Sequence, residues 1–226
     1  TCQGHDKSVR GITTVLGKKR IQQLLFLLIP LAVLMLVLAD TTGWQDVLTR
    51  EERDWLKKKG EVVFVSQTTY PPFEFTDKHG KRQGMCLELV RWIATEFGFR
   101  VRLTDATFAR AQQAVLEGRA DVLTSFFYSR KRDQQWDFTA VMWRIPATIF
   151  VKSDRPDILG LADLQGKRVA IQKGDYARDF LARKGIRFAD VPCDSFEEAT
   201  RLLIDGKADA VIGDEQIVLY YLYSSG

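Results

Sequence analysis

The hydrophobic and polar positions of this chain repeat. Residues 116–123 (Leu-Glu-Gly-Arg-Ala-Asp-Val-Leu) have nearly the same pattern as residues 204–211 (Ile-Asp-Gly-Lys-Ala-Asp-Ala-Val), 88 positions later. In each run a segment of helical period ends at a glycine, where a positive φ has no steric cost, and a short apolar strand follows. Residues 62–67 and 169–174 form a second matched pair, each an apolar strand that runs into a polar loop. Two matched halves predict two similar lobes with a cleft between them.

The order of elements predicts an α/β fold with parallel sheets. Short apolar runs that alternate with segments of helical period are typical of βαβ units. In the first half we expect strands at 61–66, 100–103 and 120–124 and helices at 85–97 and 108–117. In the second half we expect strands at 168–172, 186–189 and 208–212 and helices at 176–184 and 196–205. Residues 145–152 are rich in β-forming residues and lead to a polar segment, 153–157, which is the hinge candidate.

The N-terminal region predicts export. Residues 1–20 hold five basic residues and one acidic residue, which accounts for the whole formal charge of +4. Residues 21–39 form an uncharged, mostly apolar run, close to the roughly 20 residues that span a bilayer. We expect a cytoplasmic basic tail at 1–20 and a transmembrane helix or signal anchor at 21–39. A cleaved signal peptide that ends at Val37-Leu38-Ala39 is the alternative.

The remaining boundaries follow from these patterns. Residues 40–60 read as a connector whose helix starts at a capping box, Thr49 to Glu52, and ends at Gly60. We expect lobe 1 at residues 61–152 and lobe 2 at residues 153–226. Because the part of the chain after residue 20 is electrically neutral, nucleic acid is not an expected partner.

The cysteines allow two interpretations. Cys86 and Cys193 follow the apolar run, so a disulfide between them is possible in an oxidising compartment. The repeat places them in different lobes, however, where a bridge would hinder closure of the cleft. We therefore expect two free thiols that behave as small apolar side chains.

Candidate ligand groups come from four loops. In open α/β sheets, ligands bind beyond the carboxyl ends of the strands, where loops and helix N-termini present N–H groups. Here those loops are 67–73, 124–132, 172–176 and 213–215, and we expect all four to face one another.

Individual residues in these loops have two readings each. Tyr70 and Phe73 offer flat faces for a ligand, or else cover and fill the lobe core. Arg132 suits a carboxylate, which a guanidinium holds bidentately, although the basic run at 130–132 could be a solvated surface. Asp214 could receive an amine, and both Asp214 and Asp175 could instead be helix N-caps.

Signals of enzyme chemistry are few. His5 and His79 are the two histidines, and no His and Cys pair has metal-ligand spacing. No nucleophile elbow and no phosphate-binding glycine loop occurs. We therefore expect no catalysis, no metal and no cofactor in this chain.

Several motifs resemble one known family. They are Tyr70-Pro-Pro-Phe-Glu-Phe, Gly84-Met85, Leu116-Glu-Gly-Arg-Ala-Asp-Val, Arg132 with Trp136-Asp-Phe-Thr, Leu164-Gln-Gly-Lys-Arg-Val-Ala, Gly174, and Gly206-Lys-Ala-Asp-Ala-Val-Ile-Gly-Asp. From residue 61 to residue 226 the chain resembles type II periplasmic solute-binding proteins of family 3, which include amino-acid binders. The resemblance implies a two-lobed fold with parallel and mixed sheets.

The resemblance also implies roles for single residues. Tyr70 stands where the family stacks an aromatic ring on the ligand, Arg132 where an arginine grips the carboxylate, and Asp214 where an acid receives the α-amino group. Ser125 matches a polar position that lines the first lobe.

Three positions depart from the family pattern. Gln67 and Cys86 stand where binders of basic amino acids often have Asp, which disfavours a cationic ligand side chain. Asp175 stands where Ser or Thr commonly helps to hold the carboxylate, and a second anion there would repel it. The resemblance therefore leaves the ligand open.

The surroundings of the repeat favour a receptor. Residues 48–56 resemble the lead-in to solute-binding domains of bacterial transmembrane sensors, and the family fold crosses back after lobe 2 to finish lobe 1, a part we expect to lie beyond this fragment. Our leading hypothesis is a periplasmic sensing domain of an inner-membrane signalling receptor, a possible homodimer, that closes on a small carboxylate ligand. The alternatives are a binding protein of an ABC-type importer, and an enzyme: a lytic transglycosylase that carries this domain as a regulatory module, or a dehydratase on the same fold.

Overall fold

The computed structural model describes residues 47–224, and its contacts divide the chain after Trp55. Residues 47–55 and 56–224 are therefore described separately. In the first of these segments, the Thr49 backbone N–H donates to Oε2 of Glu52 at 2.7 Å. In return, the Glu52 N–H donates to Oγ1 of Thr49 at 3.2 Å. This is the predicted capping box, and it stands at the start of α2 (Arg50–Lys59).

The predicted basic tail and the predicted transmembrane helix lie outside the described residues. Across residues 47–224, no helix combines the length and the apolar character that a membrane span requires.

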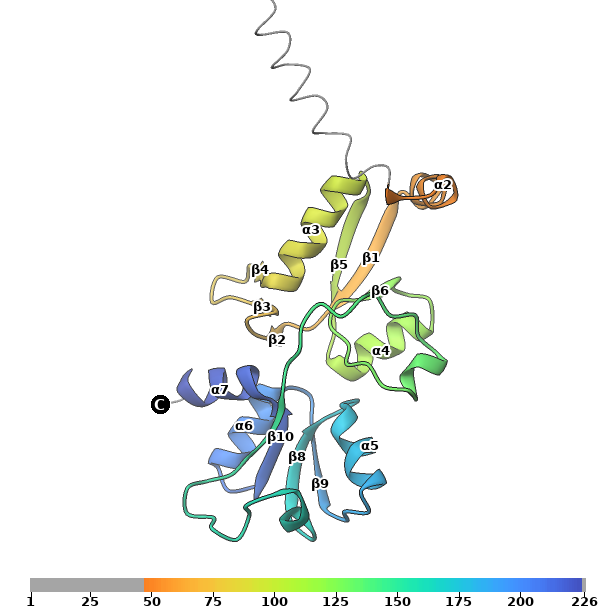
Figure 1. The fold of residues 1–226 in the computed structure, drawn as a ribbon. Coiled ribbons are helices and arrows are strands. Elements are labelled where there is room, and N and C mark those ends of the chain that lie inside the picture. Colours follow the sequence, from red (N-terminus) through yellow and green to blue (C-terminus); the bar gives the residue numbers. More distant parts are fainter. Residues whose placement is uncertain (1–46, 225–226) are drawn as a thin grey trace, which may run out of the picture. The chain divides into compact units, whose positions relative to one another are not determined.

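The first sheet holds three parallel strands in the order β5-β1-β6 (Figure 1). Its central strand is β1 (Glu61–Ser66), flanked by β5 (Arg100–Asp105) and β6 (Val122–Leu123). Side chains alternate across a strand, so β1 supplies two faces. Val62 and Phe64 pack with Val90 of α3 (Met85–Phe97). Val63 and Val65 pack on α4 (Phe108–Leu116), on the other face.

A small antiparallel sheet follows β1 in the chain. It consists of β2 (Thr69–Tyr70), β3 (Glu74–Thr76) and β4 (Arg82–Gln83). This sheet carries the Tyr-Pro-Pro-Phe-Glu-Phe motif, and it holds Tyr70 and Phe73 in buried positions.

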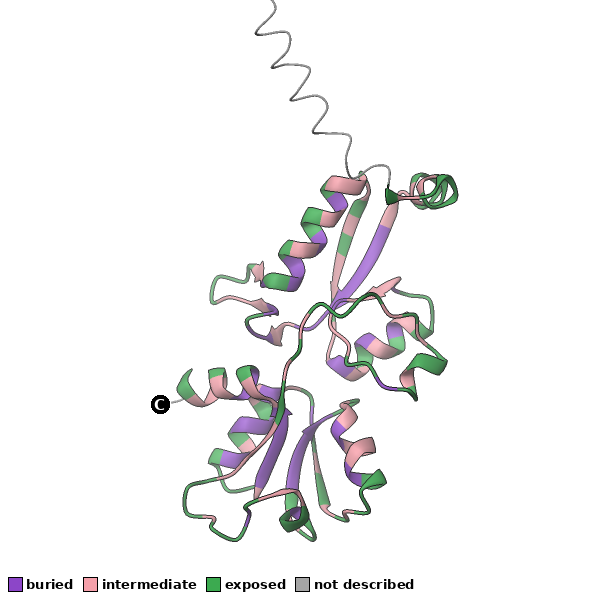
Figure 2. Ribbon diagram, in the orientation of Figure 1, coloured by how far each residue is buried: buried purple, intermediate pink, exposed green. Residues whose placement is uncertain are grey.

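The second sheet has four strands in the order β7-β10-β8-β9. They are β7 (Ala147–Phe150), β10 (Ala210–Asp214), β8 (Arg168–Gln172) and β9 (Ala189–Cys193). Strands β8, β9 and β10 run parallel, whereas β7 is antiparallel to β10. Its helices are α5 (Tyr176–Arg183), α6 (Phe196–Ile204) and α7 (Glu215–Ser224). Buried residues fill β1, β8 and β10, as Figure 2 shows.

The pairing of β7 differs from the expectation. We expected residues 145–152 at the end of lobe 1, but β7 belongs to the sheet of β10. Backbone hydrogen bonds bring β7 there, and a local apolar pattern does not encode its partner. Since β7 belongs with the second sheet, we call residues 61–138 the first half and residues 147–224 the second half.

The internal repeat is confirmed at the level of elements. Helices α4 and α6 have bounds that differ by 88 at both ends, and Ala111 and Ala199 are fully buried at matching positions. The two Ala-Asp pairs also match. Oδ2 of Asp121 accepts from the Val63 N–H at 2.9 Å, and Oδ2 of Asp209 accepts from the Arg168 N–H at 2.9 Å. Each carboxylate therefore ties the strand after its helix to a neighbouring inner strand of its sheet.

One predicted strand is wrong. We expected a strand at 186–189, but β9 covers Ala189–Cys193 and is mostly exposed at the sheet edge. Ile186 and Phe188 pack instead against the core on the α5 side. The strand contains Pro192, which has no N–H to donate and is tolerated at an edge. Cys86 and Cys193 are buried free thiols, as predicted.

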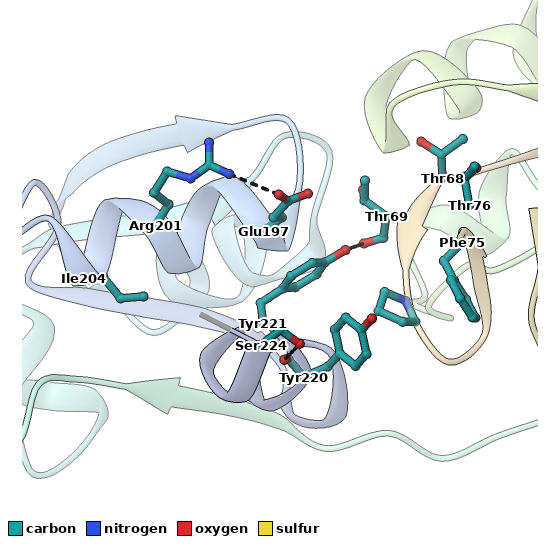
Figure 3. Close-up of a pocket in the computed structure, with 11 residues that line it drawn as sticks. Thr68, Thr69, Phe75, Thr76, Glu197, Arg201, Ile204, Tyr220, Tyr221 and Ser224 are labelled. Carbon is teal, nitrogen blue, oxygen red and sulfur yellow. Dashed lines mark hydrogen bonds and ion pairs between the residues drawn. The ribbon is translucent and has the colours of Figure 1, made fainter. Parts of the chain in front are cut away.

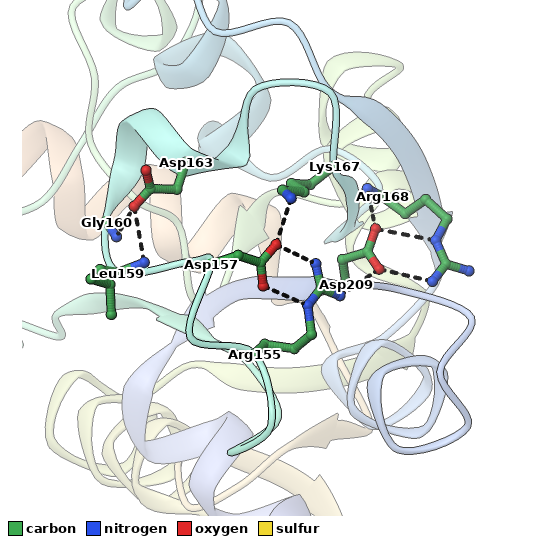
Figure 4. A network of polar contacts seen from close by, with 8 residues as sticks. All are labelled: Arg155, Asp157, Leu159, Gly160, Asp163, Lys167, Arg168 and Asp209. Atoms are coloured by element: carbon green, nitrogen blue, oxygen red, sulfur yellow. Dashed lines mark hydrogen bonds and ion pairs between the residues drawn. The ribbon is translucent and has the colours of Figure 1, made fainter.

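The predicted hinge segment, residues 153–157, lies within the second half, and ion pairs tie it to the rest of that half (Figure 4). Arg155 donates to Asp157 at 2.8 Å and to Asp209 at 2.7 Å, and Lys167 donates to Asp157 at 2.6 Å. Hydrogen bonds from Arg155 lower the pKa of Asp157, and those from Arg168 lower the pKa of Asp209.

Candidate ligand-binding site

Hydrogen bonds join the four predicted loops. The Tyr70 hydroxyl donates to Oδ2 of Asp214 at 2.5 Å. Nε2 of Gln172 donates to Oε1 of Gln67 at 2.8 Å, and Nη2 of Arg132 donates to the Gly174 carbonyl at 2.8 Å. Each bond connects the first half with the second half. The predicted convergence of the loops is confirmed, whereas the ligand-binding roles of the individual residues stay predictions.

Tyr70 and Asp214 form a partly buried pair. The Tyr70 ring lies 5.6 Å from the ring of Phe73 and 6.1 Å from that of Phe196, so its face is packed in the core. Burial raises the pKa of Asp214 to about 7; the hydrogen bond from Tyr70 opposes this, and the charge of Asp175 adds to it. Burial and the Asp214 charge raise the pKa of Tyr70. Near neutral pH this carboxyl is therefore poised between its two protonation states.

Gln67 and Gln172 are both buried, and they meet at equivalent places. Gln67 follows β1, and Gln172 is the last residue of β8, so each marks the carboxyl end of a central strand. Gln172 was not among the predicted ligand residues. Its signal in the sequence is the matched pair of strands that run into polar loops.

Arg132 is held in place before any ligand contact. Nη1 donates to the Phe127 carbonyl at 2.7 Å, and the guanidinium carbon lies 4.1 Å from the centre of the Phe126 ring. The Phe108 ring lies 5.9 Å away. Burial lowers the pKa of Arg132, and the charges of Asp175 and Asp179 oppose this shift. A guanidinium has five N–H donors, and the two carbonyls take two of them.

Asp175 is the N-cap of α5, which was the structural alternative for this residue. Its carboxylate accepts from the Ala177 N–H at 2.7 Å. Burial raises the pKa of Asp175, opposed by this bond and by the charge of Arg132. Gly174, just before it, has φ +80°, and its carbonyl also accepts from Nε2 of Gln112 at 3.2 Å.

The two remaining predicted residues are Phe73, which packs in a cluster that includes Phe196 of the second half, and the half-buried Ser125. Phe73 is buried and makes an edge contact with Trp143, with ring centres 5.5 Å apart. Oγ of Ser125 lies 3.4 Å from Sγ of Cys86. Neither residue is joined to the second half by a hydrogen bond among those of residues 47–224.

Sequence reasoning missed Glu74. This side chain is fully buried, and it accepts from the Thr124 hydroxyl and from the Gln67 N–H, the latter at 3.3 Å. Burial raises the pKa of Glu74, and the hydrogen bonds oppose the rise. Glu74 thus joins the loops after β1 and β6, which carry Gln67 and Ser125. Its place within an aromatic motif gave no signal of burial.

A pocket of about 440 Å³ is lined by a different set of residues, which includes both chain neighbours of Tyr70 (Figure 3). Its lining comes from the small sheet and from α6 and α7, and includes Thr69, Phe75, Glu197, Arg201 and Tyr220. None of the seven predicted ligand residues lines this pocket. The charged side chains of this pocket, Glu197 and Arg201, come from one helix and pair with each other, whereas the loop junction holds charged groups from both halves.

The arrangement at the junction suits a zwitterion. The first half supplies a pre-positioned guanidinium, and the second half supplies a carboxyl with a pKa near neutrality, which accepts a hydrogen bond from an aromatic hydroxyl. Such groups can bind a carboxylate and an ammonium at once. Across residues 47–224 no three acidic, His or Cys side chains gather so as to hold a metal ion.

Comparison with known proteins identifies the family. The profile of the bacterial extracellular solute-binding proteins, family 3, matches residues 62–181. The chain belongs to this family. The recognition of the type II periplasmic binding fold from sequence motifs is thereby confirmed.

Curated relatives are similar over most of this chain. The L-cystine-binding protein TcyA of Bacillus subtilis is 26% identical over 76% of this chain and 63% of its own length. A probable amino-acid ABC transporter-binding protein of Haemophilus influenzae is 27% identical over 76% of this chain and 66% of its own. The chain therefore spans slightly less than two thirds of the length of these relatives.

Solved structures include both binding proteins and a receptor domain. An ancestral arginine-binding protein bound to glutamine is 29% identical with a TM-score of 0.68, over 73% of this chain and 74% of its own. A histidine kinase sensor domain with similarity to periplasmic binding proteins is 32% identical with a TM-score of 0.65, over 73% of this chain and 72% of its own.

Proposed function

We propose that this chain is the periplasmic sensing domain of an inner-membrane signalling receptor. Its two halves act as lobes that close on a small ligand with a carboxylate and an amine. The observation that carries the proposal is the convergence of Arg132, Asp214 and Tyr70 from opposite halves at one junction. The similarity to a histidine kinase sensor domain supports a receptor role.

In this proposal each charged group has one task. Arg132 binds the ligand carboxylate through the guanidinium donors that its two carbonyl partners leave, because its ring contacts already fix its direction. Asp214 exchanges the Tyr70 hydroxyl for the ligand ammonium, and the incoming positive charge favours the ionised carboxylate. Tyr70 keeps its ring against Phe73 and offers its edge to the ligand.

The side chain of the ligand is uncharged in this proposal. Gln67 and Gln172 line the junction with amides, and Cys86 carries a buried thiol whose pKa burial raises to about 12. None of these groups supplies the negative charge that a cationic side chain needs. Glu74 is occupied by Thr124 and by the Gln67 backbone.

Calorimetric titration with the twenty common amino acids and L-cystine tests ligand binding. We expect at least one uncharged amino acid to bind, and Arg132→Ala to cost several kcal/mol of its binding free energy, because a desolvated charge partner is removed. Arg130→Ala is the matched control, since Arg130 is exposed in the same basic run and should leave the dissociation constant unchanged. An Arg132→Ala protein with wild-type affinity would exclude Arg132 as the carboxylate anchor.

The second candidate is a periplasmic binding protein that serves an ABC-type importer. The relatives from Haemophilus influenzae and Escherichia coli that are named as ABC transporter-binding proteins favour it. The two candidates differ at residues 21–39, which a receptor keeps as a membrane helix and a free binding protein loses. N-terminal sequencing of the exported protein decides: a mature chain that begins near Asp40 supports the importer, and an uncleaved chain supports the receptor.

A further inference from the structure

A second set of contacts joins the two halves outside the predicted ligand site. Nζ of Lys131 lies 3.1 Å from Oδ1 and 2.9 Å from Oδ2 of Asp179, so one ammonium binds both oxygens. Lys131 belongs to the loop after β6 in the first half, and Asp179 lies in the first turn of α5 in the second half. Both side chains are largely accessible to solvent, at 72% and 46% exposure.

Two aromatic rings lie beside this ion pair. The rings of Phe127 and Tyr176 stack with centres 6.1 Å apart and planes 13° apart. Phe127 comes from the same loop as Lys131, and Tyr176 starts α5. We call these four residues, Phe127, Lys131, Tyr176 and Asp179, the loop–α5 latch.

The loop that carries the first two latch residues is itself well anchored. The Phe126 ring makes an edge contact with the buried Phe108 of α4 at 6.0 Å, and within the loop it stacks on Phe138 at 5.6 Å and contacts Trp136 at 4.6 Å. Tyr128 makes an edge contact with Phe138 at 5.3 Å. Because this loop is packed within the first half, the latch contacts hold one half to the other and not a loose segment to a surface.

The latch is adjacent to the candidate anchor but separate from it. Lys131 immediately precedes Arg132, whose guanidinium binds the Gly174 carbonyl two residues before Tyr176. The negative charge of Asp179 acts to raise the pKa of Arg132. None of the four latch residues is a predicted ligand residue. They are therefore positioned to act on closure without contacting the ligand.

We infer that the loop–α5 latch sets the balance between the open and closed arrangements of the two halves, and so tunes ligand affinity from outside the site. This inference rests on the proposed function, which requires the halves to move. For a ligand that binds only the closed form, the apparent dissociation constant equals the intrinsic dissociation constant divided by the fraction of closed molecules. An exposed ion pair contributes little to the free-energy difference between the closed and open arrangements. This contribution corresponds to a two- to fivefold change in the ratio of closed to open molecules.

Distances between spin labels in the full chain test the latch without any ligand. One label is placed on α3 through Glu88→Cys and the other on α5 through Ala182→Cys, both at exposed positions. Cys2→Ser removes the remaining cysteine that could be labelled, because Cys86 and Cys193 are buried. Pulsed electron paramagnetic resonance then measures which fraction of molecules has the short label-to-label distance of the closed arrangement and which has the long distance of the open one.

Charge exchange makes the test specific. We expect Lys131→Glu to raise the ratio of long to short distances two- to fivefold, and Lys131→Asp with Asp179→Lys to restore it. Arg102→Glu is the matched control, since Arg102 forms an exposed ion pair of 2.9 Å with Glu61 inside the first half and should leave the ratio unchanged. The inference would be overturned if Lys131→Glu left the ratio unchanged. It would also be overturned if the double variant with Lys131→Asp and Asp179→Lys did not restore the wild-type ratio.

The outcome is independent of the amino-acid titrations. If the ratio changes as expected but no amino acid binds, the latch stands and the proposed ligand class fails. If Arg132→Ala abolishes amino-acid binding while the distance ratio ignores Lys131→Glu, the proposed function stands and the latch fails.

Discussion

At the scale of single residues, the repeated aspartate explains why the Ala-Asp pattern occurs twice. Asp209 accepts from the Arg168 backbone N–H, from the Arg168 guanidinium and from Arg155, although its side chain is only 15% exposed. Asp121 makes the matching backbone bond to Val63 and a salt bridge to Lys59. The repeat therefore preserves a structural carboxylate and not a ligand group.

We expect Asp209→Ala to lower the free energy of unfolding by about 2 to 3 kcal/mol, because hydrogen bonds to charged groups are lost and a strand N–H is left without its acceptor. Urea denaturation measures this cost. Asp205→Ala, which removes an exposed carboxylate paired with Lys207, should cost less than about 1 kcal/mol. Equal costs for the two variants would contradict the structural role.

Asp214 makes the stability of the protein depend on pH. Its pKa in the folded protein is about 7, against an ordinary value of 3.8. Between these two values the folded state holds a proton that the unfolded state has lost, so the free energy of unfolding falls as pH rises. The contribution is fully present below about pH 4 and is lost by about pH 7.

We expect Asp214→Asn to remove this part of the pH dependence, which amounts to at most about 1.4 kcal/mol per pH unit. The amide can still accept from Tyr70. The free energy of unfolding should therefore fall less from pH 5 to pH 8 in the variant than in the wild type. Urea denaturation at both pH values measures the difference. Asp137→Asn, at an exposed position, is the control and should have the same pH dependence as the wild type. If Asp214→Asn also has the wild-type pH dependence, the Asp214 carboxyl does not titrate in this range and the prediction is wrong.

At the scale of elements, Gly174 marks the closest approach of α4 to the loop before α5. Its φ of +80° is costly for any other residue, and a Cβ there would lie 2.5 Å from Nε2 of Gln112 and 3.3 Å from Cα of Ala109. Gly185 has a similar φ of +71° but open space around it. Substituting Gly185 therefore tests backbone strain alone, whereas substituting Gly174 tests backbone strain together with crowding between the halves.

We expect Gly185→Ala to cost about 1 to 2 kcal/mol of unfolding free energy, from the left-handed backbone alone. Gly174→Ala should cost about 1 kcal/mol more, because Gln112 loses its bond to the Gly174 carbonyl. Urea denaturation of both variants measures the difference. Identical costs would show that α4 does not approach Gly174 in solution.

Much of this element structure could be predicted from the chain. The bounds of β1, α3 and β8 agree with the sequence pattern, and the 88-residue repeat recurs in α4 and α6. Strand β9 could not be predicted, because an exposed edge strand with a proline has no apolar run to indicate it. The partner of β7 depends on contacts 60 or more residues away, which no local pattern contains.

The candidate site was predicted in part. Sequence and family resemblance located the loops of Tyr70, Arg132 and Asp214, which do converge. They did not indicate Glu74 or Gln172, because burial of a polar side chain depends on the packing of distant elements. The cap formed by Asp175 was recognised only as an alternative.

At the scale of the whole molecule, the proposed function couples binding and movement through one junction. Hydrogen bonds at Asp214, Gln67 and Gly174 connect the halves where the ligand is proposed to bind. A ligand can shift the balance between open and closed forms only by its differential affinity for them. A receptor built this way would report ligand by the position of the second half relative to the first.

The most direct test of this account is a crystal structure of the protein with the amino acid that titration identifies. We predict that the ligand carboxylate lies within hydrogen-bond distance of the Arg132 guanidinium and that its ammonium lies within hydrogen-bond distance of the Asp214 carboxylate. A ligand bound instead in the pocket between the small sheet and α7, or one that contacts neither residue, would contradict it.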